Sequence, residues 1–379
     1  MSLKKALNKS PRRMPLRIRA ICGVANARDS YGYRCALRLA SHPDPQRLLT
    51  ARLIQSFLNL FSARFPRSPR RRRLLGAAGG ALAVAALAGR ALANQPLPVV
   101  ATFSILADMV GEVGGERVAV TTIVGRNSDV HNFEAAPQHA RALLEARVLV
   151  LNGLDFEPWL PRLLQASGFE GRQVLASDGV EVRRLGGEPG HGHAHGDVDP
   201  HAWQDLSNGA RYVRNIARGL AQADPRNTRY YEGRAERYIG RIEALDAEIR
   251  ATLADIPAER RRVISSHDAF GYFGAAYGVE FIPVAGLSNQ AEPSARDVAR
   301  IITLARDHGV SGVFIENMSN PAMARQIARE SGALMGGTLY ADALGPLDEP
   351  AATYLGMLSW NAGRLAYVLR KAAGTGPRP

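Results

Sequence analysis

Residues 224–257 read DPRNTRYYEGRAERYIGRIEALDAEIRATLADIP, and this stretch decides the fold. Asp224 followed by Pro225 is typical of a helix start, and Pro257 of its end. Seven apolar residues between them recur at spacings of four or three, which places them on one helix face: Tyr231, Ala235, Tyr238, Ile242, Leu245, Ile249 and Leu253. The stretch predicts one long helix over residues 225–256. Its length suits a strut between two lobes, although a surface helix of one domain has the same pattern.

On both sides of this helix, strand-like and helical patterns alternate. Before it, strands are predicted at residues 98–104, 118–123, 148–152 and 173–176, and helices at 105–113, 137–145, 157–166 and 206–223. After it, strands are predicted at 263–266, 280–283, 312–316 and 333–339, and helices at 269–277, 294–308, from 321 and at 352–372. Such alternation predicts parallel sheets flanked by helices. We therefore expect an α/β protein with a mainly parallel sheet in each of two lobes, residues 94–224 and 257–379, joined by the rigid helix 225–256.

The first 93 residues differ in composition from the rest of the chain. They hold 19 of the 48 Lys and Arg residues but only 2 of the 35 Asp and Glu residues, so the remainder has a net charge of −4. The basic residues therefore lie outside the predicted lobes, and nucleic-acid binding is not expected.

Residues 68–93 have the three parts of a signal peptide. Four arginines at 70–73 precede an apolar run at 74–89 and the small residues Ala-Leu-Ala at 91–93. We expect cleavage near Ala93 and export to the periplasm, and the Arg-Arg-x-Leu-Leu pattern resembles a twin-arginine signal. The 16-residue apolar run is short for a membrane span. An uncleaved membrane anchor is the alternative.

Residues 1–67 look unlike a domain, and we interpret them as a non-native or disordered extension, produced by a start codon placed too far upstream. Both cysteines of the chain, Cys22 and Cys35, lie in this segment. The mature chain would then have no thiolate for a metal and none for lipid attachment. We expect a soluble periplasmic protein, and a monomer.

Four of the nine histidines fall within residues 191–201. His191, His193 and His195 are spaced by Gly and Ala and lack the apolar periodicity of a core segment, so they predict an accessory metal-binding loop. A solubilising loop is the alternative interpretation. His201 differs because it follows Asp199-Pro200 and precedes a helical pattern, which favours a fixed ligand.

Three other titratable residues follow predicted strands: His131 in the loop after strand 118–123, His267 at the end of strand 263–266, and Asp342 after strand 333–339. In open parallel sheets, ligands bind beyond the carboxyl ends of the strands. Together with His201, these residues make a set of three imidazoles and one carboxylate, which can close a tetrahedral zinc site with no position left for water.

Other titratable residues near these positions are given smaller roles. Glu134, Asp268 and Glu316 are candidate outer or substitute oxygen ligands. His139 lies on a helical pattern and His308 near a helix end, and we expect both to be structural.

Seven segments carry a resemblance that covers residues 98–369: VVATFSILADMV (99–110), DVHNFEAAP (129–137), NGLDFEPWL (152–160), DPHAW (199–203), SHDAFGYF (266–273), EPS (292–294) and LYADAL (339–344). Together they resemble the zinc- and manganese-binding periplasmic solute-binding proteins of ABC transporters, also called cluster A-I or cluster 9. The resemblance implies that His131, His201, His267 and Asp342 occupy metal-ligand positions and that the long helix is a rigid connector between lobes. It also implies a divalent metal ion as cargo and an inner-membrane ABC permease as partner.

The same resemblance favours Zn²⁺ over Mn²⁺. Members that carry manganese tend to offer a more oxygen-rich set, whereas this chain has an imidazole at the third position and a His-rich loop. A manganese-carrying member of the family is the alternative.

Two functions of other classes fit the sequence less well. A zinc hydrolase needs an open coordination position and a general base. The sequence has no His-Glu-x-x-His, and His195 stands where metallo-β-lactamase-like hydrolases have Asp. An adhesin of the same fold would be expected to carry a lipid-anchoring cysteine. We therefore expect a binding protein and no enzyme.

Overall fold

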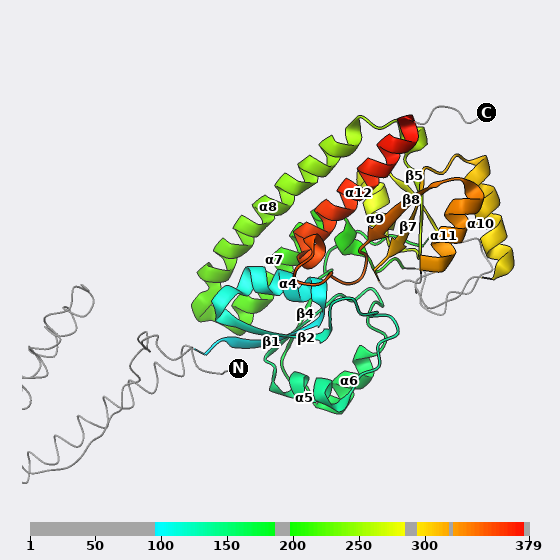
Figure 1. Cartoon of the computed structure of the whole chain (residues 1–379). Coiled ribbons are helices and arrows are strands. Elements are labelled where there is room, and N and C mark those ends of the chain that lie inside the picture. The colour runs from blue at the N-terminus through cyan, green and yellow to red at the C-terminus, as the bar shows by residue number, and fades with distance from the viewer. Residues whose placement is uncertain (1–94, 186–197, 285–293, 318–320, 375–379) are drawn as a thin grey trace, which may run out of the picture. The chain divides into compact units, whose positions relative to one another are not determined.

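The strands that the structure describes form two four-stranded parallel sheets (Figure 1). The computed structural model describes residues 95–185, 198–284, 294–317 and 321–374. All of these belong to one compact unit, Gly89–Pro379. Across these four ranges, no helix combines the length and the apolar character that a membrane crossing needs.

The first sheet has the strand order β2-β1-β3-β4. Its strands are β1 (Leu97–Phe103), β2 (Val118–Val124), β3 (Val148–Leu151) and β4 (Arg172–Leu175). The central strands β1 and β3 are almost entirely buried because helices cover both faces, which explains their continuous apolar runs. One face is covered by α4 (Ser104–Gly114) and α7 (Leu206–Ala223), and the other by α5 (Pro137–Glu145) and α6 (Leu160–Ser167).

The second sheet repeats this order as β6-β5-β7-β8. Its strands are β5 (Arg262–Ser265), β6 (Glu280–Pro283), β7 (Gly312–Glu316) and β8 (Leu334–Leu339). Helices α9 (Gly271–Tyr277) and α12 (Tyr354–Gly374) lie on one face, and α10 (Ala295–Asp307) and α11 (Pro321–Ser331) on the other. The prediction of two similar α/β halves is confirmed. In each half the strand order reverses next to the first strand, which is where such sheets bind ligands.

The long helix, α8 (Thr228–Ala254), has 27 residues and is about 40 Å long. It starts later than predicted, since Pro225–Asn227 form a 3₁₀ turn in which Asp224 accepts hydrogen bonds from Asn227 Nδ2 (2.6 Å) and Tyr231 Oη (2.9 Å). All seven residues of the predicted apolar stripe are buried, and Ile239 joins them. α8 packs against α4 and α7 of the first lobe and against α9 and α12 of the second (Figure 1).

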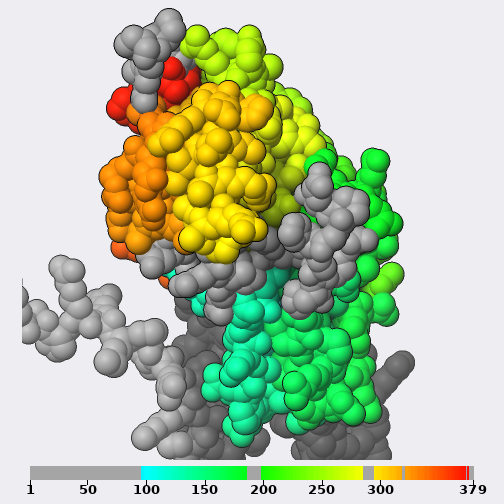
Figure 2. All heavy atoms as spheres, turned by 90° about the vertical axis from the view of Figure 1, so that its right-hand side faces the viewer, coloured from blue at the N-terminus to red at the C-terminus, as the bar shows by residue number. Residues whose placement is uncertain are grey.

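The two lobes share one hydrophobic core. The larger buried cluster runs from β1 through α8 to α12, whereas a smaller one lies between the second sheet and α10 and α11. Trp203 and Tyr354 join the lobes within the larger cluster, where both are fully buried and Tyr354 Oη donates to Trp203 O at 2.6 Å. Figure 2 shows the second lobe in yellow and orange above the first lobe in cyan and green.

The starts of three more helices, α6, α9 and α12, differ from the prediction by two or three residues, and α9 begins at Gly271 and not at 269. α6 begins at Leu160 and not at 157, because the Glu157 side chain turns back to accept the backbone N–H groups of Asn152 and Gly153. α12 begins at Tyr354, after a 3₁₀ turn over Pro350–Ala352.

Candidate metal centre

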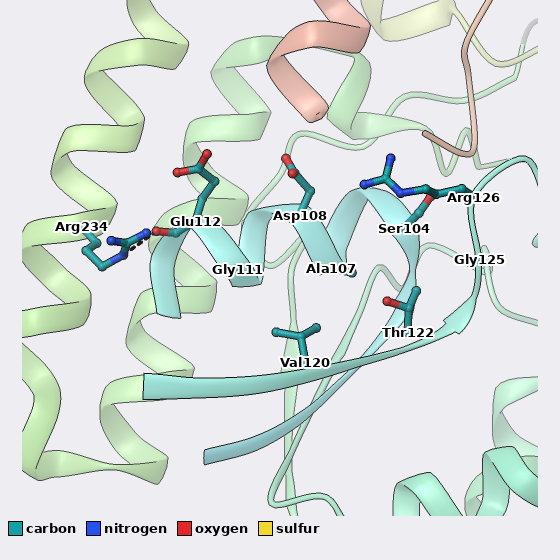
Figure 3. Close-up of a pocket in the computed structure, with 10 residues that line it drawn as sticks. All are labelled: Ser104, Ala107, Asp108, Gly111, Glu112, Val120, Thr122, Gly125, Arg126 and Arg234. Atoms are coloured by element: carbon teal, nitrogen blue, oxygen red, sulfur yellow. Dashed lines mark hydrogen bonds between the residues drawn. The ribbon is translucent and has the colours of Figure 1, made fainter. Parts of the chain in front are cut away.

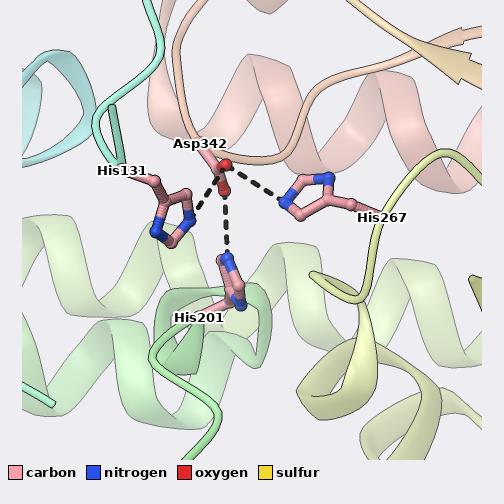
Figure 4. A group of neighbouring side chains, drawn as sticks. All are labelled: His131, His201, His267 and Asp342. Atoms are coloured by element: carbon pink, nitrogen blue, oxygen red, sulfur yellow. Dashed lines mark ion pairs between the residues drawn. The ribbon is translucent and has the colours of Figure 1, made fainter. Parts of the chain in front are cut away.

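Four side chains from distant parts of the chain meet at the carboxyl ends of the two sheets: His131, His201, His267 and Asp342 (Figure 4). One nitrogen or oxygen atom of each lies within 4.8 Å of those of the others. His201, His267 and Asp342 are at most 1% exposed, and the His131 side chain is 8% exposed. The structure thus brings together the four residues that the sequence singled out.

The His131 side chain projects from the loop after β2. Asp129 Oδ1 accepts the backbone N–H of His131 at 2.8 Å, which forms an Asx turn. Trp159 Nε1 donates to the carbonyl of Val130 at 2.9 Å and fixes the same loop from the α6 side. These two contacts turn His131 toward the centre.

His201 and His267 each have a carboxylate behind the ring. Asp199 Oδ1 lies 2.9 Å from His201 Nδ1 and accepts the backbone N–H of His201 at 3.0 Å. Glu316 Oε2 lies 2.5 Å from His267 Nδ1, and its Oε1 accepts the backbone N–H of His267 at 3.1 Å. Both carboxylates are buried. Because each lies at Nδ1, the ring presents Nε2 to the centre.

The spacing between the four groups fits a common ion. Asp342 Oδ1 lies 3.3 Å from His201 Nε2, and Asp342 Oδ2 lies 3.2 Å from His267 Nε2 and 3.6 Å from His131 Nε2. Two ligands of one zinc ion, each about 2.1 Å from it at a tetrahedral angle, are about 3.4 Å apart. Within the described residues, the three Nε2 atoms and both Asp342 oxygens are buried without a hydrogen-bond partner.

The electrostatics of the centre also suit a cation. Burial alone would raise the pKa of Asp342, but His267 and His201 hold that pKa well below its usual range. Burial would lower the pKa of His267, but Glu316 and Asp342 outweigh it and raise the pKa well above its usual value. Burial lowers the pKa of His131, with Asp342 opposing. An ionised carboxylate is therefore held among imidazoles.

The loop that carries Asp342 belongs to the second half of the sequence but is bonded to the first lobe. Trp203 Nε1 and Gln204 Nε2 both donate to Ala341 O at 3.0 Å, and Leu344 N donates to Ser104 Oγ at 3.0 Å. The loop therefore has hydrogen bonds to both lobes, since Tyr340 is also bonded to Asn361 of α12.

Two residues that line a hollow of about 570 Å³ between α4 and β2 help to hold this loop (Figure 3). Arg126 Nη1, at its rim, donates to Gly345 O and Ala352 O, both at 2.7 Å. Asp108 Oδ2 accepts the backbone N–H of Tyr354 at 2.9 Å. None of the four residues of the metal centre lines this hollow.

The remaining candidates lie elsewhere. Glu134 is exposed, and neither Glu134 nor Asp268 belongs to the cluster of four. Glu316 contacts Nδ1 of His267, on the side of the ring away from the centre. His139 lies in the first turn of α5, where Nδ1 accepts the backbone N–H of Ala136 at 2.9 Å, and His308 is exposed after α10.

Some predictions fall outside the described residues. The accessory loop with His191, His193 and His195 lies in residues 186–197, and the extension and signal peptide lie in residues 1–94.

Two residues next to the centre, Asp199 and Phe156, were not predicted from the sequence. Asp199 had a usable signal, since a carboxylate two residues before a histidine can hold both its N–H groups. The Phe156 ring lies 4.8 Å from that of His131 and 5.8 Å from that of His201. Its position depends on the conformation of residues 153–155, which no spacing pattern indicates.

A two-lobed α/β shell around one buried site for a divalent cation defines a solute-binding protein for metal ions. The chain belongs to the family described as zinc-uptake complex component A, periplasmic, which matches residues 99–368. The family is not catalytic and serves ABC transporters that import divalent metal ions, which confirms the expectation of a binding protein and no enzyme.

The names of similar proteins refer to different metal ions, some to manganese and some to zinc. The manganese-binding lipoprotein MntA of Halalkalibacterium halodurans is 31% identical over 268 residues, which cover 71% of this chain and 87% of MntA. The Mn-bound periplasmic metal-binding protein of Candidatus Liberibacter asiaticus has a TM-score of 0.64 at 26% identity, over 72% of this chain and 98% of that one. The periplasmic zinc-binding protein TroA of Treponema pallidum has a TM-score of 0.66 at 28% identity, over 73% of this chain and 99% of TroA. Divalent metal binding is shared, but zinc itself is not confirmed, and the relatives' names support the manganese alternative better.

Proposed function

We propose that the chain captures a divalent transition-metal ion in the periplasm through His131, His201, His267 and Asp342, and delivers it to an inner-membrane ABC permease. One observation carries the proposal. Three imidazole nitrogens and two carboxylate oxygens are buried and converge without hydrogen-bond partners in the described part of the chain. Buried polar atoms are normally satisfied, and a cation bound among them would take the three nitrogens and at least one of the carboxylate oxygens as ligands.

Zinc is the ion that this set of ligands would hold more tightly. Three imidazoles and one carboxylate match its preference for four ligands. Zinc also lies above manganese in the affinity order of first-row divalent ions at nitrogen and oxygen sites. The family's description and TroA both name zinc.

Manganese is the second candidate cargo, and the names of MntA and the Liberibacter protein favour it. The geometry allows it, because both oxygens of Asp342 face the centre. A carboxylate that binds through two oxygens would raise the coordination number above four, which suits an ion that prefers oxygen ligands.

Metal analysis of protein purified from the periplasm, followed by competition titrations with Zn²⁺ and Mn²⁺, tests both proposals. The His267→Ala variant should lose tight binding of either ion. His308→Ala is the matched control because His308 is exposed and outside the centre. Wild-type affinity in the His267→Ala variant would refute the site, and the ion recovered from the cell would decide between the two cargoes.

Release of the metal ion would involve a separation of His267 from the other three ligands. The Asp342 loop is bonded to Trp203, Gln204 and Ser104 of the first lobe, whereas His267 is bonded to Glu316 of the second. A permease that shifts the second lobe slightly would withdraw one imidazole and leave an open coordination position.

We also propose that the N-terminal segment directs export with cleavage near Ala93, and that His191, His193 and His195 collect metal ions for the centre. N-terminal sequencing of the exported protein tests the first proposal, and a mature chain that retains Cys22 would refute it. Metal uptake by a variant with all three loop histidines changed to Ala tests the second.

A further inference from the structure

The turn after β3 has an uncommon backbone conformation. Gly153, Leu154 and Asp155 have φ angles of 78°, 54° and 59°. Leu154 and Asp155 are two of the three non-glycine residues with positive φ in the described part of the chain. Residues other than glycine rarely have a positive φ, so contacts with the surrounding residues must stabilise this backbone conformation. Such turns are common at functional sites.

Glu157 holds the turn. Its Oε1 accepts hydrogen bonds from Asn152 N and Thr102 Oγ1, both at 2.7 Å, and its Oε2 accepts one from Gly153 N at 3.0 Å. The side chain is 6% exposed. A single buried carboxylate thus ties the end of β1 to both residues that enter the turn.

The turn places the Phe156 side chain against the metal centre. Phe156 is fully buried, and its ring packs edge-on against that of His131, with centroids 4.8 Å apart, and lies 5.8 Å from that of His201. Phe103 (4.9 Å) and Trp203 (4.8 Å) support it from behind. The wall of aromatic rings restricts rotation of the His131 imidazole.

His131 needs such a wall more than the other two histidines. His201 and His267 are oriented by carboxylates at Nδ1. In the described residues, the only hydrogen bond or ion pair of the His131 ring is the 3.6 Å approach of Nε2 to Asp342. Metal-bound histidines are normally fixed by a partner beyond the metal, and here the partner is a ring.

We propose that Phe156 is a positioning residue that fixes the imidazole of His131 for four-coordinate binding, and that it thereby sets the preference of the centre between Zn²⁺ and Mn²⁺. The inference deepens the proposed function and depends on it. Loss of the wall frees the imidazole and admits water, which harms a tetrahedral zinc site more than a site with higher coordination.

The test uses the variants Phe156→Ala and Phe156→Leu in the full chain. Phe156→Leu keeps most of the buried volume and serves if the alanine variant does not fold. Phe169→Ala is the control, since Phe169 is a partly buried residue between α6 and the start of β4, at the opposite end of the sheet from the centre. The readouts are the visible absorption spectrum of bound Co²⁺, which distinguishes tetrahedral from higher coordination, and the ratio of the Zn²⁺ and Mn²⁺ dissociation constants.

We expect both Phe156 variants to lower the preference for Zn²⁺ over Mn²⁺ by about tenfold or more and to shift the Co²⁺ spectrum toward higher coordination. The inference is overturned if folded Phe156 variants match the Phe169→Ala control in both readouts. A wild-type protein that prefers Mn²⁺ would instead remove zinc as the cargo, and the change in the Co²⁺ spectrum between wild type and Phe156→Leu would still decide the role of Phe156.

Discussion

Replacement of Glu157 by glutamine would measure how burial of this carboxylate, in the turn after β3, affects the free energy of unfolding. Burial raises the pKa of Glu157 from 4.5 to about 7, although Asn152, Thr102 and Gly153 donate hydrogen bonds to it. Because the pKa is higher in the folded chain than in the unfolded one, the folded chain binds a proton over this pH range that the unfolded chain has lost. The group therefore contributes stability at low pH, and this contribution is lost as the pH rises through about 7.

The size of the effect follows from the shift. A pKa unit corresponds to about 1.4 kcal/mol, and for a shift from 4.5 to about 7 the loss between pH 5 and pH 8 is about 2.5 kcal/mol. Glutamine does not ionise, so the variant lacks this loss. We expect the free energy of unfolding of Glu157→Gln, relative to wild type, to rise by about 2.5 kcal/mol from pH 5 to pH 8.

The assay is urea unfolding of the metal-free chain at each pH unit from 5 to 8, without metal so that ligand binding does not add its own stabilisation. The difference between the two proteins removes the contributions of groups that they share. Glu145→Gln, at an exposed position of α5, controls for the substitution itself. A difference that stays level or falls with pH would refute the reasoning, because it would mean that the three donors outweigh burial and keep Glu157 ionised.

Four further predictions concern the centre and the long helix. Glu316→Gln should weaken metal binding by about 10- to 100-fold, because Glu316 orients His267, and an unchanged titration would contradict that role. A metal ion at 100 times its dissociation constant should stabilise the chain by about 2.7 kcal/mol and a chelator should reverse this, so a melting temperature indifferent to both argues against a buried site. Burial opposes protonation of His267, but Glu316 and Asp342 raise its pKa well above the usual value. Metal binding at pH 7 should therefore release a proton and tighten as the pH rises, and a calorimetric enthalpy that is the same in all buffers would speak against this. Ile242→Ala, at a buried position of α8, should lower the free energy of unfolding by about 2–5 kcal/mol in urea while metal affinity stays the same.

Most of the fold could be predicted from local patterns. The strands are short apolar runs and the helices have clear apolar faces, so both four-stranded sheets and the long helix were expected. The helix starts were less accurate because they depend on tertiary contacts. α6, for example, begins only after Glu157 has given its carboxylate to the backbone of Asn152 and Gly153.

The candidate site could be found from one topological rule, since the carboxyl ends of the strands meet at one edge of each sheet. The rule does not say which lobe holds which group. The loop that carries Asp342 is bonded to the first lobe through contacts such as that of Trp203 with Ala341, which are 138 residues apart in sequence. The rule also does not reveal which residues orient the ligands. Glu316, for example, orients His267 but lies 49 residues away in sequence. The choice of zinc rested on the ligand types, which admit manganese as well.

The shared core limits how far the centre can open. Trp203 and Tyr354 are fully buried against each other's lobe, and such aromatic side chains bury about 150–250 Å² each. At about 25 cal/mol per Å², exposing one of them costs about 4–6 kcal/mol. That is as much as a bound ion contributes at roughly 1,000 times its dissociation constant, about 4 kcal/mol. Opening that separates these residues is therefore unfavourable. The Asp342 loop stays with them because Ala341 is bonded to Trp203, so we expect the centre to open through a small displacement, such as one at His267, and not through a wide separation of the lobes.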